Sequence, residues 1–452
     1  MNKDLTVGKP SQVLWQFCLP MFGSIIFQQL YNIADSLVAG KFIGENALAA
    51  VSLAFPVQNL MIAVATGTGV GVNAALSRNL GEKNFDRANR IADHALFLAA
   101  MSYIVFALFG LFFARQFFRL QTDIEEIVDL GTTYLRVCTI ASFGLFMEIA
   151  CERLLQSTGK TIYSMYTQGL GAIINIVMDP ILIFGLCGAP RMGVAGAAVA
   201  TVVGQIVAAI VGLIVNIKCN HDIHIRRENI RWDPIVAKEI YRVGIPSIIM
   251  QSISSVMTFG MNKILFVFTP TATAVFGAYF KIQSFVFMPI FGLNNGMVPI
   301  ISYNYGAARP QRVWKTIRLS NITAMVIMVV GFTIFQLFPS TLLELFDASE
   351  TMLAIGVPAL RIISVSFLLA GFCIIAGSVF QAIGNPVHSL IVSVCRQMVV
   401  LLPVAWLLSR TGRLELVWWS FPIAEVMSFT LSTIFLRRTV KSANEVMNSS
   451  AD

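Results

Sequence analysis

The sequence predicts an all-α polytopic membrane protein with twelve transmembrane helices. They form two six-helix lobes related by a pseudo-two-fold axis along the membrane normal. Three observations lead to this fold class: an apolar composition, apolar segments long enough to cross a bilayer, and an internal repeat. Of the 452 residues, 56% are hydrophobic and 12% are charged, with a mean hydropathy of +0.74. A soluble domain carries about 25% charged residues, so we expect the bilayer to be the solvent.

Apolar segments recur along the whole chain, separated by Gly, Pro and clusters of charged residues. A segment of about 18 residues or more can cross the ~30 Å hydrocarbon layer as a helix. The predicted spans are 13–39, 47–74, 93–114, 130–154, 163–186, 193–217, 244–268, 272–300, 317–338, 356–380, 387–409 and 416–436.

The spans divide the chain into an N-terminal lobe, a basic cytoplasmic linker, a C-terminal lobe and a cytoplasmic tail. These segments are 1–217, 218–243, 244–440 and 441–452. Most Lys and Arg residues outside the spans fall on one side of this topology, which the positive-inside rule places in the cytoplasm. We therefore expect a multi-pass protein of the plasma (inner) membrane with both termini cytoplasmic. The net charge of +8 then reflects orientation in the membrane, and no nucleic-acid partner is expected.

The second half of the chain repeats the first at a spacing of 225 residues. The matched pairs are Gln58/Gln283, Gly67/Gly292, Gly71/Gly296, Ser77/Ser302, Asn79/Asn304, Gly81/Gly306, Arg87/Arg312, Gly131/Gly356, Arg136/Arg361, Gln156/Gln381 and Gly159/Gly384. Chance does not keep one register over so many positions. Each half has six predicted spans, so the repeats are parallel, an arrangement found in transporters whose site lies between the halves.

Three acidic residues stand out within the predicted spans: Asp35, Glu148 and Asp179. A charge at this depth costs about 2.5 to 3.5 kcal/mol on insertion scales, so it indicates a function. Asp35 and Asp179 both lie near the outer end of an outward-running helix and could share one site. Two carboxylates there would repel, so one is expected to exchange a proton unless a cation such as Na⁺ lies between them. The alternative is that both are hydrogen-bonded packing groups.

Polar residues accompany both aspartates at helical spacing. The two polar faces are formed by Gln28, Asn32 and Asp35 on the first span and by Gln168, Asn175 and Asp179 on the fifth. Both faces are expected to point into the N-terminal lobe. Pro180 would free a backbone carbonyl on the preceding turn, which could help to bind a cation. The C-terminal repeat has no acid at the positions equivalent to Asp35 and Asp179, so these acids are not part of a general scaffold.

Other charged residues within the spans have no assigned role. Glu148 lies close to Glu152 and Arg153 near the cytoplasmic end of its span, which suggests a local ion pair or a charge in the vestibule, and the alternative is a role in transport. Four more are found in the C-terminal half alone, and the sequence does not assign their partners: Lys263, Lys281, Arg396 and Glu425. No hydrolase triad, metal-ligand cluster or Walker motif is present. We therefore expect neither enzymatic activity nor a cofactor.

The chain resembles the multidrug and toxic compound extrusion (MATE) transporters over nearly its whole length. The motifs that carry the resemblance are Leu19-Pro20, Asp35, Gly81-Glu82, Tyr134-Leu135-Arg136, Gln156-Ser-Thr-Gly159-Lys160, Asn175-Ile-Val-Met-Asp179-Pro180 and Gly193-Val-Ala-Gly196-Ala-Ala. The acid on the first span and the Asn-x-x-x-Asp motif are most similar to the branch that includes the DinF-like and archaeal members. The resemblance implies two lobes that form a V and alternate between outward-open and inward-open states.

The resemblance also implies a secondary active antiporter that exports small organic cations in exchange for H⁺ or Na⁺. The residues that match the coupling-cation site, including the alternative of Na⁺, are Asp35, Asn175, Asp179 and, on the sixth span, Thr201. Gln28 matches a position on the drug path, and Asn32 and Gln168 are further candidates for the substrate cavity. Other branches use acids of the C-terminal lobe, but the seventh span here has Gln251 and Lys263 and no carboxylate.

Two other functions compete with drug export. A flippase for lipids or lipid-linked oligosaccharides belongs to the same superfamily, but such proteins usually have a strongly basic cavity and often fourteen spans. A membrane-embedded enzyme or an assembly scaffold would need a catalytic cluster or a large extramembrane surface. The expected partners are therefore small-molecule organic cations and the lipid bilayer, and the expected oligomeric state is a monomer.

Overall fold

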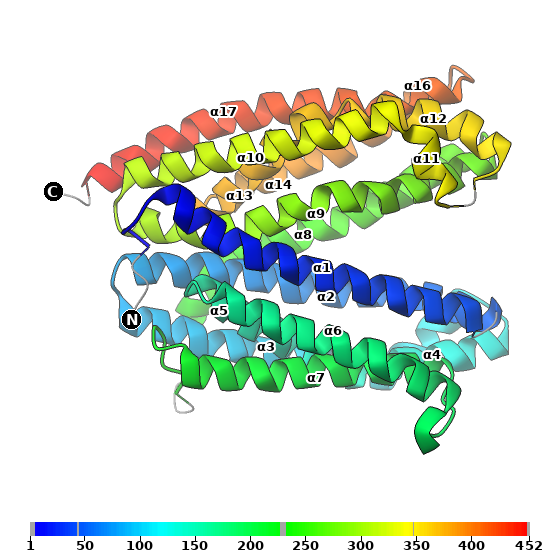
Figure 1. Ribbon diagram of the computed structural model, residues 1–452, viewed down its shortest axis with the longest axis horizontal. Coiled ribbons are helices and arrows are strands. Elements are labelled where there is room, and N and C mark those ends of the chain that lie inside the picture. Colours follow the sequence, from blue (N-terminus) through cyan, green and yellow to red (C-terminus); the bar gives the residue numbers. More distant parts are fainter. Residues whose placement is uncertain (1–4, 43–44, 227–231, 347, 450–452) are drawn as a thin grey trace. The chain divides into compact units, whose positions relative to one another are not determined.

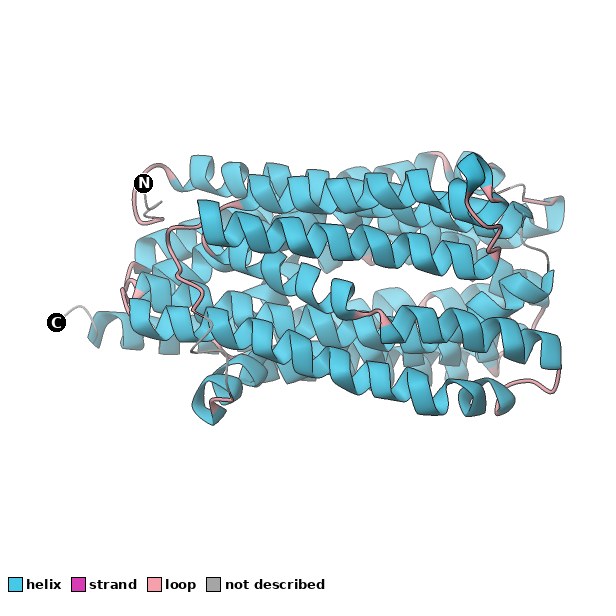
Figure 2. Cartoon of the chain, turned by 90° about the horizontal axis from the view of Figure 1, so that it is seen from below, coloured by secondary structure: helices cyan, strands magenta, loops and turns pink. Residues whose placement is uncertain are grey.

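The computed structural model describes residues 5–42, 45–226, 232–346 and 348–449, and the side chains of residues 31–49 and 194 lie outside this description. The described residues form helices and loops and contain no strand (Figure 2). The predicted all-α fold class is thus confirmed. The chain divides into two compact units: unit 1 includes Leu19–Gly244, and unit 2 consists of Leu5–Cys18 and Ile245–Asp452.

Figure 1 labels most of the helices. The first half of the chain contains α1 (Pro10–Phe42), α2 (Glu45–Gly81), α3 (Phe85–Arg119), α4 (Glu125–Ile140), α5 (Phe143–Ser157), α6 (Thr161–Phe184), the short 3-10 helix η1 (Leu186–Gly188) and α7 (Val194–Cys219). The second half contains α8 (Pro234–Phe266), α9 (Pro270–Gly306), α10 (Pro310–Leu337), α11 (Pro339–Glu344), α12 (Glu350–Ser364), α13 (Phe367–Ile383), α14 (Pro386–Val394), the π-helix η3 (Cys395–Leu401), α15 (Leu402–Ser409), α16 (Leu414–Trp418) and α17 (Ser420–Ser449). Six of these helices begin with proline, whose missing N–H is not needed for a hydrogen bond at the first helical position.

Ten helices in the described part of the chain are long and apolar enough to cross a membrane. Two bent pairs raise this number to twelve when each pair is one span: α4 with α5, bent by 40°, and α12 with α13, bent by 51°. The predicted twelve spans are confirmed. The bends fall between Ile140 and Phe143 and between Ser364 and Phe367, which are equivalent places in the repeat.

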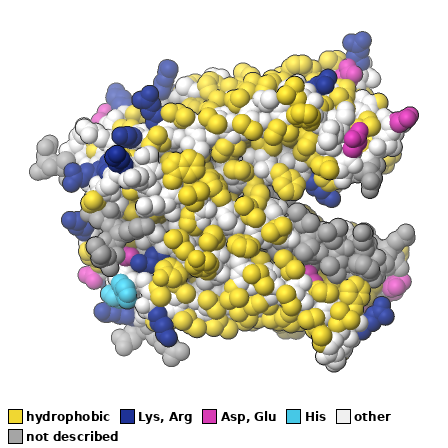
Figure 3. All heavy atoms as spheres, viewed as in Figure 1, with side chains coloured by type: hydrophobic (Ala, Val, Ile, Leu, Met, Phe, Trp, Pro, Cys, Tyr) yellow, Lys and Arg dark blue, Asp and Glu magenta, His cyan; other side chains and the backbone are white. Residues whose placement is uncertain are grey.

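The outer surfaces of the helices are suited to lipid. Large apolar side chains are exposed in mid-helix, among them Phe112 and Phe113 on α3 and Val329 and Val330 on α10. On the face shown in Figure 3, hydrophobic side chains cover the middle of the helices, and Lys and Arg lie mostly toward their ends. Apolar side chains match the hydrocarbon layer and charged ones its borders, so this protein is a multi-pass membrane protein.

Helices α1 and α8 each belong to both units. α1 is part of unit 2 as far as Cys18 and of unit 1 thereafter, whereas α8 is part of unit 1 as far as Gly244 and of unit 2 thereafter. A proline follows each change of unit, Pro20 in α1 and Pro246 in α8. Each proline removes one N–H from the helical hydrogen-bond ladder. The two helices are therefore interrupted at equivalent places in the repeat.

These divisions also locate the segments at the borders of the predicted lobes. The predicted linker, 218–243, contains the end of α7 and the first turns of α8, which pack in unit 1. The segment Leu5–Cys18, within the predicted N-terminal lobe, packs in unit 2. The reason is a set of close contacts made by residues that recur in the repeat.

Glycines at equivalent positions allow the first turns of α8 and α1 to pack closely. In unit 1, a Cβ on Gly71 would clash with the backbone carbonyl of Ile240 and would lie 3.1 Å from the nitrogen of Gly244. In unit 2, a Cβ on Gly296 would lie 3.0 Å from the nitrogen of Cys18. Small residues permit backbones to approach in this way. Close packing therefore explains why both repeats have glycine at this position.

A second pair of repeated residues, Arg87 and Arg312, bonds to the start of α8 and to the segment just before α1. In unit 1, Glu239 of α8 accepts from Nη2 of Arg87 at 2.9 Å and from Nδ2 of Asn79 at 2.8 Å. In unit 2, Nη2 of the equivalent Arg312 donates to the carbonyl of Leu5 at 3.0 Å. Arg87 and Arg312 therefore have a structural role.

Glu239→Gln is expected to destabilise the fold. The substitution removes the negative charge to which Arg87 and Asn79 donate hydrogen bonds. Hydrogen bonds to charged groups contribute about 1.5 to 3 kcal/mol. Because the carboxylate is 31% exposed, we expect a loss of about 1 to 2 kcal/mol in the free energy of unfolding. Thermal unfolding in detergent measures the effect. The control is Glu82→Gln, whose exposed ion pair with Arg78 should contribute less than about 0.5 kcal/mol; equal losses in both variants would contradict this role.

Candidate cation-binding site in unit 1

Helices α6 and α7 approach closely because glycines lie at their contact. A Cβ on Gly204 of α7 would lie 2.7 Å from the carbonyl oxygen of Gly171 and 3.4 Å from Cβ of Asn175. A Cβ on Gly171 would in turn lie 3.0 Å from Cβ of Ala208. Neither helix could carry a larger side chain here without moving away. The contact brings the polar residues of the two helices together.

Asn175 and Thr201 meet across this contact. Nδ2 of Asn175 donates to Oγ1 of Thr201 at 3.2 Å, and this hydroxyl donates to the carbonyl of Ala197 at 3.0 Å. Asn175 is 1% exposed, and its Oδ1 is buried without a hydrogen-bond partner among the described residues. A buried amide oxygen in this situation is costly unless a ligand satisfies it. Two residues assigned to one site from the sequence are therefore in contact.

Asp179 lies one turn after Asn175 on the same face of α6. Its side chain is 1% exposed. Pro180 lies inside α6 and cannot donate to the carbonyl of Ile176, four residues earlier. A carboxylate, an amide oxygen, a hydroxyl and a freed carbonyl thus lie along two turns of α6 and the facing turn of α7.

The residues predicted on the first span are only partly described. Asn32 and Asp35 are helical in α1, but their side chains lie outside the described part of the structure. Their place in this site stays a prediction. Gln28 is exposed on the surface of the protein. Gln168 of α6 is half-buried, and its Oε1 has no hydrogen-bond partner among the described residues.

Glu148 lies on α5 and belongs to another part of unit 1. No ion pair joins it to a described residue, so the local ion pair considered from the sequence does not form. Its neighbours on α5 bond to one another: Nε2 of Gln156 donates to Glu152 at 2.7 Å, and Nη1 of Arg153 donates to Gln156 at 2.9 Å. A charge in the vestibule and a role in transport both stay predictions for Glu148.

The donor atoms of the site favour a hard cation. Within the described ranges, no group of three or more His, Cys, Asp or Glu side chains could hold a metal ion. Oxygens from a carboxylate, an amide and a hydroxyl suit Na⁺ or a proton better than a transition metal, which prefers nitrogen or sulfur. The residues therefore fit the two coupling ions expected from the sequence.

Sequence reasoning missed the two glycines that position this site. Gly171 precedes Asn175 by one turn, and Gly204 follows Thr201 by about one turn. A small residue one turn from a buried polar residue is the signal that indicates a close helix contact. The polar residues alone showed which face of α6 is important, and the glycines show which helix lies against it.

A profile of the MatE family matches this chain twice, at residues 20–181 and 246–407. The chain belongs to the MatE family. The two matched segments begin at Pro20 and Pro246, 226 residues apart, so the internal repeat is supported, with a single-residue gap before the pairs that are 225 apart. The first match covers Asp35, Asn175 and Asp179. The resemblance to MATE transporters is confirmed, whereas the assignment to the DinF-like branch stays a prediction.

Named relatives align with almost the whole of this MatE protein. The probable multidrug resistance protein YoeA of Bacillus subtilis (strain 168) is 27% identical, over 94% of this chain and 93% of its own. The FAD transporter of Shewanella oneidensis is also 27% identical, over 92% of both chains. A solved structure described as the outward-facing conformation of a multidrug resistance MATE family transporter is 26% identical, with a TM-score of 0.91 over 98% of both chains.

Proposed function

We propose that this MatE protein is a secondary active antiporter that exports small organic cations in exchange for H⁺ or Na⁺. The observation that carries the proposal is the buried oxygen site of Asn175, Thr201 and Asp179, with its unsatisfied amide oxygen. The multidrug names of one relative and one solved structure support the substrate class. Transport, and no enzymatic reaction, is then the activity of the protein.

The mechanism follows from the charge of the site. When Asp35 and Asp179 are ionised and no coupling ion is bound, unit 1 presents negative charge that attracts a cationic substrate. Protonation, or binding of Na⁺ with Asn175 and Thr201, reduces that negative charge and weakens the hold on the substrate, which leaves outward. Gln28, Asn32 and Gln168 contribute polar groups to the substrate path in this proposal.

The coupling ion supplies the energy. A membrane potential contributes about 2.3 kcal/mol per elementary charge per 100 mV, so inward movement of one cation can drive export against a gradient. Both termini are cytoplasmic in this proposal, because the basic loops then obey the positive-inside rule. The protein works as a monomer in the plasma membrane in this proposal, because one chain contains both repeats and all the residues assigned to the site.

Efflux of ethidium tests the proposal. Cells that express the wild type, Asp35→Asn or Asp179→Asn are loaded with ethidium, and the proton and Na⁺ gradients are collapsed separately. We expect the wild type to lose efflux when one of the two gradients is removed, which identifies the ion, and both variants to show no efflux above empty cells. Undiminished efflux by both variants would rule out the site.

The use of ethidium also tests the substrate class. A relative of equal identity is named a FAD transporter, so membership of the family does not define the substrate. Absence of ethidium efflux by well-expressed wild type would favour a metabolite or lipid substrate over organic cations.

A further inference from the structure

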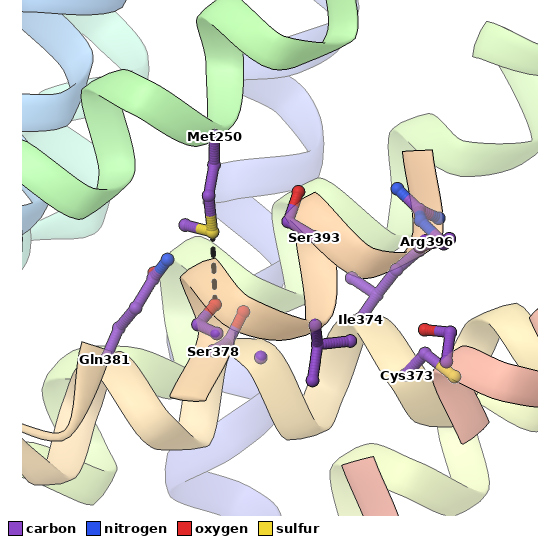
Figure 4. Close-up of a pocket in the computed structure, with 11 residues that line it drawn as sticks. Met250, Cys373, Ile374, Ser378, Gln381, Ser393 and Arg396 are labelled. Atoms are coloured by element: carbon purple, nitrogen blue, oxygen red, sulfur yellow. Dashed lines mark hydrogen bonds between the residues drawn. The ribbon is translucent and has the colours of Figure 1, made fainter. Parts of the chain in front are cut away.

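A cavity of about 150 Å³ lies in unit 2, between α8, α13, α14, η3 and α17, and several polar side chains are part of its otherwise apolar lining. Figure 4 shows Met250 extending from α8 toward it, with Ser378 and Gln381 on α13 and Ser393 and Arg396 on the opposite wall. Among the described residues that line it, Arg396 is the one with a charge. The cavity is distinct from the site of Asn175, because every lining residue belongs to unit 2.

Two of the serine hydroxyls that line this cavity, those of Ser378 and Ser389, do not bond to the backbone of their own helix among the described residues. Serine and threonine inside membrane helices usually donate to the carbonyl three or four residues earlier, as Thr430 and Thr433 do on α17. Ser378 and Ser389 do not: Ser378 has no side-chain hydrogen bond among the described residues, and Ser389 contacts only the sulfur of Met250, at 3.3 Å. The hydroxyl of Ser378 is therefore available to a ligand, and a ligand would displace only a weak sulfur acceptor from the hydroxyl of Ser389.

The side-chain amide of Gln381 is a third donor available to a ligand. Comparison with the repeat shows that this availability is particular to unit 2. Its equivalent in unit 1, Gln156, is fully buried and bonded to Arg153 and Glu152. Gln381 is half-buried and has no side-chain hydrogen bond within the described part of unit 2. Of this equivalent pair, Gln156 is thus part of a buried hydrogen-bond network in unit 1, whereas Gln381 faces a cavity in unit 2.

Arg396 is only weakly neutralised. Its one hydrogen bond to a described residue runs from Nη1 to Oε2 of Glu425, at 3.4 Å, and the side chain is 34% exposed. Glu425 is 5% exposed and does not line the cavity, and its Oε1 has no hydrogen-bond partner among the described residues. A guanidinium has five N–H donors, so most of those of Arg396 remain for a second anion.

The backbone around Arg396 is unusual as well. Residues Cys395–Leu401 form a π-helix, whereas the equivalent stretch of α6 is continuous α-helix. Short π-helical segments are rare and occur frequently at functional sites. The helices α14 to α17 are the repeat equivalents of α6 and α7, so the oxygen site of unit 1 and the ion pair of Arg396 with Glu425 in unit 2 lie on equivalent helices.

We propose that this cavity binds the anionic group, a phosphate or a carboxylate, of a ligand through Arg396 and the hydroxyl and amide donors opposite it. The volume supports this proposal. Cavities that hold whole drug-sized molecules are about 300 to 1,000 Å³, whereas 150 Å³ is enough only for a phosphate or carboxylate group. The rest of the ligand extends from the opening. If the protein is the transporter proposed above, its transported molecules include zwitterions and anions. Only this statement about transport rests on the proposed function.

Two flavins provide a matched test. Riboflavin and flavin mononucleotide (FMN) share one fluorescent ring system, and FMN adds a phosphate. The full chain in lipid-free detergent is titrated with each. We expect the wild type to bind FMN about tenfold more tightly than riboflavin, the effect of one charge-assisted hydrogen bond. Arg396→Gln should remove this preference and leave riboflavin binding unchanged, which also shows that the variant is folded.

A substitution of Glu425, the ion-pair partner of Arg396, should change FMN affinity in the opposite direction. Glu425→Gln removes the competing carboxylate, so FMN affinity should rise above that of the wild type. If the ion pair were merely structural, Arg396→Gln and Glu425→Gln would weaken the protein alike and leave FMN and riboflavin indistinguishable. Asp179→Asn should not alter the FMN preference, so failure of the proposed antiport site and failure of this site can be told apart.

A phospholipid headgroup offers the same chemistry as a soluble phosphate. Competition with short-chain phosphatidylglycerol, and with zwitterionic phosphatidylcholine as its control, separates the two sources. Binding of phosphatidylglycerol that depends on Arg396, without a preference for FMN, would identify the ligand as a lipid. Equal affinity for FMN and riboflavin, with no binding of phosphatidylglycerol that depends on Arg396, would overturn the proposal.

Discussion

Asn175→Leu is expected to abolish coupled efflux. Leucine has nearly the same shape as asparagine but provides neither the amide oxygen nor the donor to Thr201, which stands 3.2 Å away. The coupling ion then loses a ligand in a site closed to water, and removal of one charge-assisted contact costs about 1.5 to 3 kcal/mol, or about 10- to 100-fold in affinity. The measurement is ethidium efflux in proteoliposomes as a function of Na⁺ concentration and of pH.

Asn216 provides a matched control for this substitution. It is also a buried asparagine of unit 1, but its Nδ2 donates to the carbonyls of Gly212 at 2.8 Å and Cys151 at 3.0 Å, so its role is structural. Asn216→Leu should lower the unfolding temperature and leave the ion dependence of the remaining efflux unchanged. The same ion dependence in wild type and Asn175→Leu would show that Asn175 only packs α6 against α7.

The second large effect is expected for Gly71→Leu. A Cβ here would clash with the backbone carbonyl of Ile240 and would lie 3.1 Å from the nitrogen of Gly244. Backbone atoms cannot rotate away as a side chain does, so the first turns of α8 must leave unit 1. Overpacked positions cost about 1 to 3 kcal/mol, and we expect this one to reach or exceed about 3 kcal/mol. Size-exclusion profiles and thermal unfolding in detergent measure the loss.

Gly277→Leu tests whether leucine in a membrane helix is harmful in itself. Gly277 is exposed on α9, and a Cβ there would meet no atom within 4 Å. This variant should elute and unfold like the wild type. If Gly71→Leu also remained monodisperse and equally stable, the close packing of α2 against α8 would be refuted.

The fold could be predicted well because its main signals are local in the sequence. Long apolar segments predict spans, and the repeat predicts two similar sets of six. The bends between α4 and α5 and between α12 and α13 were not predicted, since the apolar pattern continues across them. The placement of Leu5–Cys18 in unit 2 was not predicted either, because it depends on contacts with Arg312 and Gly296, far away in the sequence.

The candidate site could be predicted in part. Depth in the membrane and helical spacing were enough to associate Asn175 with Asp179 on one face of α6. The pairing of Asn175 with Thr201 came from the family resemblance, and the structure shows the hydrogen bond. The ion pair of Arg396 with Glu425 could not be assigned, because a sequence shows that a charge needs a partner without showing which helix provides it.

The sequence by itself determined the class of the protein: an all-α membrane protein of two parallel repeats, with acids in the first half that the second half lacks. These properties depend on hydropathy and periodicity, which each segment carries alone. Only the tertiary structure decided which helices meet, and so which polar groups are satisfied and which face a cavity. Helix association in lipid relies on close packing of small residues such as Gly171 and Gly204, and that geometry exists only when both helices are in place.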